Sequence, residues 1–203
     1  MVIKNEARDQ AIARSRELIR LCAEAIRATH RHEWDNAQAK LAEARAAADT
    51  MIAIVDGHPD LYHSGYTQDA LKEVVEGFVT FAIIRDEPLP TLETLNVIPS
   101  TYLNGLAEAA TELRRFILDL LRRAADADAS DEAERLLDWM DAIYDQLITF
   151  DFPSAITGDL RRRTDVVRGV LERTRGDLTT TLREQSLQAA LQRVEARLMS
   201  LDE

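Results

Sequence analysis

The spacing of apolar and polar positions along the chain is typical of helices. A first long helix is predicted from about Asn5 to about His32, and an alanine-rich second helix from Trp34 to Val55. Asp56-Gly57-His58-Pro59 ends the second helix, because it combines a flexible residue with a helix breaker. The connection between the two helices is short, so they are expected to pack antiparallel. Three isoleucines at heptad spacing predict the buried side of the first helix: Ile12, Ile19 and Ile26.

Helix signals continue through the middle of the chain. The polar residues 58–68 are expected to form a loop, with Thr67 as the cap of the next helix. That helix contains the apolar segment Leu71–Ile84 and ends near Arg85, since Pro88 and Pro90 prevent its continuation. One short helical turn is predicted at residues 91–97. Pro99 then suits the first turn of a long helix that reaches about Ala125.

The remainder of the chain also reads as helical. A helix capped by Ser130 is predicted to reach about Thr149, with six residues facing inward, namely Leu136, Leu137, Met140, Ile143, Tyr144 and Leu147. An aromatic loop, Phe150-Asp-Phe-Pro-Ser-Ala-Ile-Thr-Gly158, leads to a last helical stretch that is expected to break or bend near Gly176. The fold class is therefore all-α. The length of the chain fits one domain over residues 1–203.

Two pairs of carboxylates lie beside apolar faces of these helices. Glu73 and Glu76 are three residues apart within an apolar segment, and Glu108 and Glu112 are four residues apart on the following long helix. Like charges at these spacings repel, and their burial without a partner costs several kcal/mol. A divalent cation, an arginine or a shared proton would relieve that cost. The alternative is an ordinary surface arrangement, in which the first pair extends into solvent and Glu112 pairs with Arg115.

The charge balance limits the partners that the chain can bind. A net charge of −11 argues against a domain that binds nucleic acid by bulk attraction. However, 22 of the 25 basic residues are arginines, which bind phosphate through two parallel hydrogen bonds. Four arginines of the first helix fall on one side of it, namely Arg16, Arg20, Arg27 and Arg31, and are called here the arginine ridge. The alternative is a solvated flank that pairs with Glu17 and Glu24.

Other classes of site and location are less supported. The single cysteine, Cys22, lies beside the apolar stripe of the first helix, so it is expected to be a buried structural thiol. The four histidines lack the spacing of a zinc site. No apolar run is long enough to span a bilayer, and the first residues lack the apolar segment of a signal peptide. A cytoplasmic protein is therefore expected.

Three stretches together resemble the translin and TRAX (translin-associated factor X) family. The first helix, with Ser15-Arg16-Glu17 and His30-Arg31, is similar to the family's opening. The segment Leu71-Lys-Glu-Val-Val-Glu-Gly-Phe-Val-Thr-Phe resembles the TRAX segment with two nuclease glutamates, and Tyr102-Leu-Asn-Gly-Leu-Ala-Glu-Ala-Ala-Thr-Glu resembles the helix with the remaining acids. The tail, from Phe150-Asp-Phe-Pro to Arg175-Gly176, resembles the compact archaeal branch. The match covers almost the whole chain.

This resemblance implies a fold and an assembly. The family's fold is a translin-like α-α superhelix, a bundle of about seven helices. Its members assemble into a closed, barrel-like homo-oligomer, an octamer by resemblance, with RNA-binding surface inside. Translin subunits bind single-stranded RNA or DNA, whereas TRAX subunits hold a metal-dependent endoribonuclease site.

The same resemblance implies roles for particular residues. Glu73 and Glu76 match the catalytic glutamate pair, Glu112 matches the neighbouring glutamate, and Glu108 stands where the nuclease subunit has an aspartate. This departure adds one methylene and moves the carboxylate by about 1.5 Å. The four carboxylates would form an oxygen-only site for Mg²⁺ or Mn²⁺. Arg115 and the arginine ridge would bind the phosphate backbone.

Three functions are compatible with the sequence. The first is a metal-dependent endoribonuclease that acts on single-stranded RNA. The second is a non-catalytic oligomer of translin type that binds single-stranded nucleic acid, in which the acids have no catalytic role. The third is an interaction scaffold without a nucleic-acid role, which the acidic net charge would favour.

Overall fold

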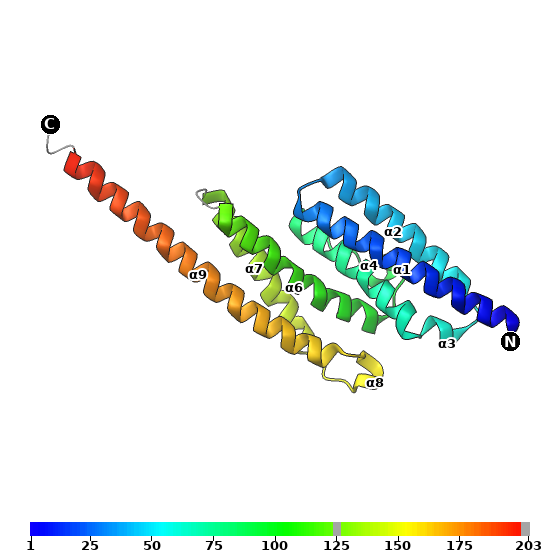
Figure 1. The fold of residues 1–203 in the computed structure, drawn as a ribbon. Coiled ribbons are helices and arrows are strands. Elements are labelled where there is room, and N and C mark those ends of the chain that lie inside the picture. Colours follow the sequence, from blue (N-terminus) through cyan, green and yellow to red (C-terminus); the bar gives the residue numbers. More distant parts are fainter. Residues whose placement is uncertain (124–126, 200–203) are drawn as a thin grey trace.

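In the computed structural model, which describes residues 1–123 and 127–199, every regular element of these ranges is an α-helix (Figure 1). The all-α prediction is therefore confirmed. The long helices of the described ranges are α1 (Val2–His30), α2 (Trp34–Val55), α4 (Gly65–Ile84), α6 (Pro99–Arg123), α7 (Ala127–Leu147) and α9 (Leu160–Met199). Short helices of four residues lie in the connections: α3 (Pro59–Tyr62), α5 (Leu92–Leu95) and α8 (Ser154–Thr157).

Most helix boundaries agree with the sequence pattern. Helix α2 has the predicted bounds, α6 begins at Pro99, and the side chain of Thr91 accepts a hydrogen bond from the amide of Thr94 at the start of α5. Two predicted caps are wrong. Thr67 lies inside α4, where its hydroxyl donates to the carbonyl of Leu61, and Ser130 lies inside α7. The predicted end of α6 at about Ala125 lies outside the described residues.

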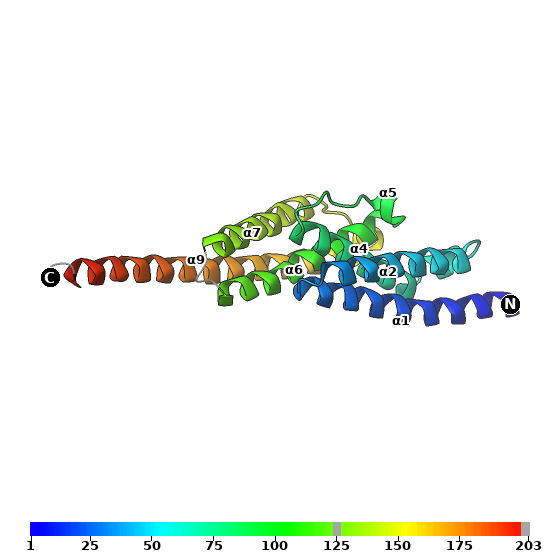
Figure 2. The same cartoon turned by 90° about the horizontal axis from the view of Figure 1, so that it is seen from above.

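The long helices form two groups that pack against each other. Helices α1, α2 and α4 pack against one another, α6, α7 and α9 form the second group, and α4 packs against α6 between them. Figures 1 and 2 show the resulting elongated shape, with the N-terminus at one end and the C-terminal half of α9 projecting at the other. The largest cluster of buried apolar side chains includes residues from both groups. In the described ranges no helix has the length and apolarity needed to cross a membrane.

The buried side of α1 differs from the predicted isoleucine stripe. Leu18 and Cys22 are fully buried, whereas Ile19 is 38% exposed and Ile12 is only partly buried. Ile26 alone of the three isoleucines is buried. The reason is that α2 and α4 cover α1 through small side chains, so that alanines and Cys22 occupy the contact where helix axes approach closely.

A glycine sets the distance between the two groups of helices. A Cβ atom added at Gly105 of α6 would lie 2.5 Å from Cβ of Val75 and 2.8 Å from the carbonyl oxygen of Lys72, both on α4. Side chains cannot approach so closely, so α6 can pack at this distance only because residue 105 has none. This contact places the following turn of α6, which contains Glu108, against the acidic turn of α4.

Helix α9 continues without interruption through Gly176, so the predicted break near this residue does not occur. Its first half packs on α6 and α7, and Leu178 is its last buried residue within the described range. Beyond that point it exposes apolar side chains at the spacing of a helix-pairing seam. These residues, called here the distal stripe, are Leu187, Leu191, Val194 and Leu198.

Candidate functional site

Three of the four predicted acids meet at the contact between α4 and α6. Glu73 and Glu76 project from α4, and Glu108 projects from α6. One carboxylate oxygen of each residue lies within 4.8 Å of the others, and all three side chains are partly buried. We call these residues the carboxylate cluster. Like charges at this separation are unfavourable unless positive charge lies nearby.

The fourth predicted acid, Glu112, lies one turn further along α6 and is held by other partners. It hydrogen-bonds to Nε2 of His30, a buried residue at the end of α1, and lies 3.7 Å from the guanidinium of Arg115. The hydrogen bond to His30 holds the pKa of Glu112 below its usual value, although burial opposes this effect. Glu112 therefore lies beside the carboxylate cluster as an ionised side chain that α1 holds in place.

Two cations contact the carboxylate cluster directly. The ammonium of Lys72 bonds to Glu108 and lies 3.0 Å from Oε1 of Glu73, and the guanidinium of Arg163, from the first turn of α9, bonds to the other oxygen of Glu108. Lys72 is only 10% exposed at its side chain. The three helices α4, α6 and α9 therefore meet in a network of partly buried charges.

Neither Lys72 nor Arg163 bonds to Glu76. It makes no hydrogen bond or ion pair with the described residues, and its burial together with the charges of Glu73 and Glu112 raises its pKa to about 7. Lys72 and Arg163 act in the opposite direction but more weakly. Among the acids of the described site, Glu76 is therefore the one without a directly bonded cation, and it holds a proton more readily than an ordinary glutamate does.

This arrangement fits a divalent metal ion. The donor atoms are all carboxylate oxygens, which are the ligands that Mg²⁺ and Mn²⁺ prefer. Neighbouring ligand oxygens of an octahedral Mg²⁺ lie about 3 Å apart and opposite ones about 4 Å. The oxygens of Glu73, Glu76 and Glu108 lie within 4.8 Å of one another, so small side-chain rotations would bring them to that geometry. A cation beside Glu76 would also balance its charge.

Cys22 packs beneath the carboxylate cluster and is a buried thiol, as predicted. Burial and the charges of Glu73 and Glu76 raise its pKa to about 12. A thiol with so high a pKa stays protonated near neutral pH and is a poor nucleophile. Cys22 thus contributes packing between α1 and α4, next to the acids.

The comparisons with known proteins agree with this architecture. AfC3PO, a translin-like protein whose structure is solved both alone and with duplex RNA, superimposes with a TM-score of 0.79 and is 31% identical. The match covers 87% of this chain and 90% of AfC3PO. The chain belongs to the translin family. An uncharacterized protein of Methanocaldococcus jannaschii is also 31% identical to this translin-family chain over 197 residues. The match covers 96% of this chain and 85% of the relative.

A further solved relative, apo-NeC3PO, supports the translin fold at lower identity. It has a TM-score of 0.76 and is 21% identical, with 87% of this chain and 90% of the other covered. No protein-family model matches the chain.

The arginine ridge does not meet the carboxylate cluster in this translin-family chain. All four of its side chains are exposed, and at 100° per residue they lie on the side of α1 away from its buried residues. Arg20 pairs with Glu24, and Arg31 lies 4.0 Å from Glu33, as the solvated-flank alternative describes. Arg16 and Arg27 make no ion pair with the described residues. Arg115, through Glu112, is the predicted arginine that adjoins the acids.

Sequence reasoning missed three residues of the site, namely Lys72, His30 and Arg163. Each contacts an acid that is distant in the chain, so its spacing carries no signal: 36 residues separate Lys72 from Glu108, 82 separate His30 from Glu112, and 55 separate Arg163 from Glu108. The position of Lys72 next to Glu73, inside an apolar segment, was the one local indication that a cation is buried there.

Proposed function

We propose that this chain is a metal-dependent endoribonuclease subunit that acts on RNA. The observation that carries the proposal is the carboxylate cluster, in which oxygens of Glu73, Glu76 and Glu108 lie within 4.8 Å of one another. A cluster of three partly buried acids is unfavourable for the fold by itself, so a role in binding a cation explains its presence. Glu112 would support the same site from the next turn of α6.

Binding of nucleic acid is supported by the similarity to AfC3PO, which is solved in complex with duplex RNA and matches almost the whole chain. Single-stranded RNA is the substrate that the family resemblance favours, and single-stranded DNA is a second ligand. The negative net charge does not oppose such binding, because the local potential near Arg115, Arg163 and Lys72 decides where a phosphate can lie.

The residues of the site would have different roles in the reaction. Glu73, Glu76 and Glu108 would hold Mg²⁺ or Mn²⁺, which when bound supplies charge stabilisation at a phosphate and a water of lowered pKa. Without a metal the pKa of Glu76 is raised to about 7, and a bound cation would favour the ionised form that a metal ligand needs. Glu112 is oriented by His30, and Arg163 and Lys72 would neutralise charge on the RNA backbone.

A second candidate is an oligomer that binds nucleic acid without cleaving it. The observation that favours it is the position of the Lys72 ammonium, which lies between Glu73 and Glu108 and already neutralises part of the cluster. If the carboxylates kept Lys72 and Arg163 as permanent partners, the site would be a structural charge network.

Self-association belongs to the proposal as well. We assign the distal stripe of α9 to contact with a second copy of the chain. Its heptad spacing is that of helices that pair through knobs-into-holes packing, and the exposed fractions of its members range from 54% to 61%. A barrel-like homo-oligomer, an octamer by family resemblance, would bury this stripe.

The decisive experiment is cleavage of an end-labelled RNA by the purified protein and by Glu76→Gln, each with EDTA, Mg²⁺ or Mn²⁺. Single-stranded and duplex RNA of the same sequence are compared. We expect the wild type to cut only with metal, and Glu76→Gln to lose at least about 10²-fold in rate, because one ligand of the metal is removed. Glu184→Gln, an exposed acid of α9, is the matched control and should cut normally.

The outcomes separate the candidates. Binding of RNA without cleavage under every metal condition would support the non-catalytic oligomer. Cleavage that Glu76→Gln retains would exclude the carboxylate cluster as its source. An absence of salt-dependent binding to any RNA or DNA would exclude both nucleic-acid functions and support the interaction scaffold.

A further inference from the structure

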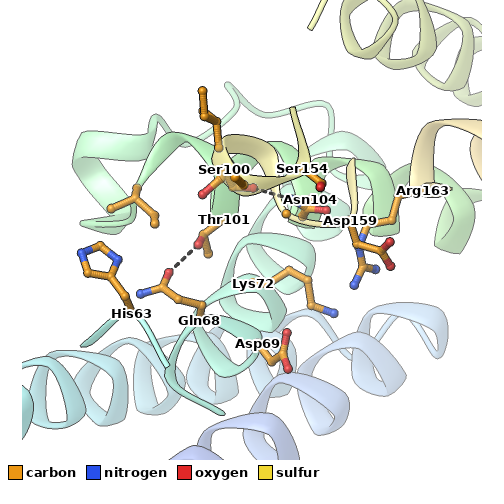
Figure 3. Close-up of a pocket in the computed structure, with 14 residues that line it drawn as sticks. His63, Gln68, Asp69, Lys72, Ser100, Thr101, Asn104, Ser154, Asp159 and Arg163 are labelled. Carbon is orange, nitrogen blue, oxygen red and sulfur yellow. Dashed lines mark hydrogen bonds between the residues drawn. The ribbon is translucent and has the colours of Figure 1, made fainter. Parts of the chain in front are cut away.

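A pocket of about 530 Å³ opens beside the carboxylate cluster. It lies where the first turns of α4 and α6 face the α8–α9 connection, as Figure 3 shows. Its volume is within the range of small-molecule sites, which measure about 300–1,000 Å³. None of the residues proposed above as metal ligands lines it, so it is a separate space that adjoins the cluster.

The pocket and the carboxylate cluster share two cations. Lys72 and Arg163 line the pocket and also bond to Glu108. Their charged ends are turned toward one another in Figure 3, from α4 on one side and α9 on the other. In addition, Nε of Arg163 is buried and has no hydrogen-bond acceptor among the described residues. A phosphate at this wall of the pocket would lie next to the carboxylate cluster.

The other walls suit the remainder of a nucleotide. Ser100 and Ser154 present hydroxyl groups, and Ile98 and Ile156 supply apolar side chains, with Ile156 65% exposed. Asp69 offers carboxylate oxygens that can accept hydrogen bonds from ribose hydroxyls. The pocket therefore combines two cations, hydrogen-bonding groups and apolar side chains against which a base can pack. Its second acid, Asp159, accepts a hydrogen bond from Arg162.

Hydrogen bonds connect the helices that frame the pocket. Nδ2 of Asn104 donates to the carbonyls of Ser100 and Thr157, at 2.7 and 2.8 Å, and so ties the start of α6 to the end of α8. The hydroxyl of Thr101 donates to Gln68, which ties α6 to α4. A preformed frame lowers the entropic cost of binding a ligand.

We propose that this pocket binds one nucleotide of the RNA strand, with its phosphate on Lys72 and Arg163 and its base against Ile98 and Ile156. The inference rests on the proposed function, because it takes the carboxylate cluster as the neighbouring metal site. It adds a nucleotide subsite that fixes the strand beside the cluster. The same chemistry would bind a free nucleoside monophosphate.

The shared cations couple the pocket to the metal site. Without metal, Lys72 bonds to Glu73 and Glu108 and Arg163 bonds to Glu108, so these acids neutralise the charge of both cations. When a divalent cation neutralises these acids, the two cationic side chains become available to a phosphate. The metal and the nucleotide therefore tighten one another's binding by the same factor, as linkage requires.

The test measures binding of adenosine 5′-monophosphate by calorimetry, in EDTA and in Mn²⁺. We expect Mn²⁺ to tighten binding at least fivefold in the wild type and not in Glu76→Gln. Ile156→Glu places a negative charge at the pocket and should weaken binding at least about tenfold. Ile148→Glu is the control, because Ile148 is 50% exposed, lies outside the pocket and undergoes the same change of charge.

Ser154→Glu serves as a second pocket variant if Ile156→Glu fails to fold, since Ser154 is exposed and its side chain makes no hydrogen bond in the described structure. Equal binding by the wild type and the folded pocket variant, or no binding at millimolar concentration in Mn²⁺, would overturn the proposal. Mn²⁺ binding itself, followed in the same variants by electron paramagnetic resonance, should be unchanged by Ile156→Glu.

A final arm separates the two sources of the nucleotide and the two proposals. If the pocket serves the RNA strand, the monophosphate competes with RNA and Ile156→Glu raises the KM for cleavage. Competition without any cleavage would refute the nuclease while the subsite stands. Metal-dependent cleavage with the same KM in Ile156→Glu and Ile148→Glu would refute the subsite while the nuclease stands. Monophosphate binding that RNA does not displace would refute its assignment to the strand.

Discussion

At the scale of single residues, Glu76 distinguishes a site from a structural charge network. Glu73 and Glu108 have cationic partners and Glu112 has His30, whereas Glu76 is partly buried and has no such partner among the described residues. The charged groups that act on it come from three elements: Glu73 and Lys72 from its own helix, Glu112 from α6 and Arg163 from α9. A fold gains nothing from burying such a group, so its cost indicates a function.

This cost predicts a pH dependence of stability in metal-free protein. The folded-state pKa of Glu76, about 7, exceeds the ordinary value of 4.5, so the folded state binds a proton more tightly than the unfolded state does. The contribution of Glu76 to the free energy of unfolding is therefore most favourable below pH 4.5, where both states are protonated. It falls as the pH rises from 4.5 to 7, because the unfolded state loses this proton first. Glu76→Gln removes this loss.

Urea unfolding in EDTA at pH 5.5 and pH 8 measures the effect. The stability of Glu76→Gln relative to the wild type should rise between these pH values by about 2 kcal/mol. Glu184→Gln should show no such change, because Glu184 is exposed. A constant difference between Glu76→Gln and the wild type at both pH values would show that Glu76 is ionised normally in the folded protein.

At the scale of elements, the contact between α4 and α6 builds the site. Three acids from two helices come together only because the helices touch at Gly105, where any side chain would collide with Val75 and with the backbone of Lys72. The first turn of α9 then adds Arg163 from a third direction. The geometry of the carboxylate cluster therefore depends on helix packing more than on any single acid.

The Gly105→Ala variant tests this dependence. Ala raises helix propensity by about 1 kcal/mol, but the overlap with Cβ of Val75 at 2.5 Å forces α4 and α6 apart. We expect a net loss of about 1–3 kcal/mol in the free energy of unfolding and weaker Mn²⁺ binding. Calorimetric titration and thermal unfolding measure both quantities.

Gly176→Ala is the matched control for this variant. Gly176 lies in α9, and no atom of the described residues is within 4 Å of an added Cβ, so the helix propensity of Ala should stabilise the protein by up to about 1 kcal/mol and leave metal binding unchanged. Normal metal binding by Gly105→Ala would show that the close contact of α4 and α6 is dispensable for the site.

At the scale of the whole molecule, α9 extends beyond the core that its first half helps to build. Figures 1 and 2 both show its C-terminal half projecting away from the other helices. The distal stripe occupies one side of this projection, and exposed apolar stripes of this kind indicate an interaction site. A second copy would cover it and would bring two sets of sites into one particle.

The Leu191→Asp variant tests this assembly by light scattering after gel filtration. We expect the wild type to elute as an oligomer and Leu191→Asp to dissociate into smaller species, because a charge at the centre of a helix-pairing seam is strongly unfavourable. Ala189→Asp carries the same charge on the opposite side of α9 and should assemble normally. A monomeric wild type, or an unchanged Leu191→Asp oligomer, would contradict the assignment of this stripe.

The sequence by itself determined the helices and the acidic pairs. Helix bounds such as Trp34–Val55 and the start at Pro99 follow from apolar periodicity and from glycine and proline, which act on the backbone within a few residues. The spacing of Glu73 and Glu76 placed both on one side of a helix for the same local reason. The wrongly predicted break at Gly176 shows the limit of such signals, because packing of the first half of α9 carries the helix through it.

Only the tertiary structure decided which partners each acid has. The contacts of Lys72 and Arg163 with Glu108, and of His30 with Glu112, join helices that are distant in the chain, and they depend on how closely those helices pack. The same packing buried Leu18 in place of Ile19, and it turned the arginine ridge away from the acids. Periodicity along one helix assigns its faces, but the neighbouring helices determine what each face meets.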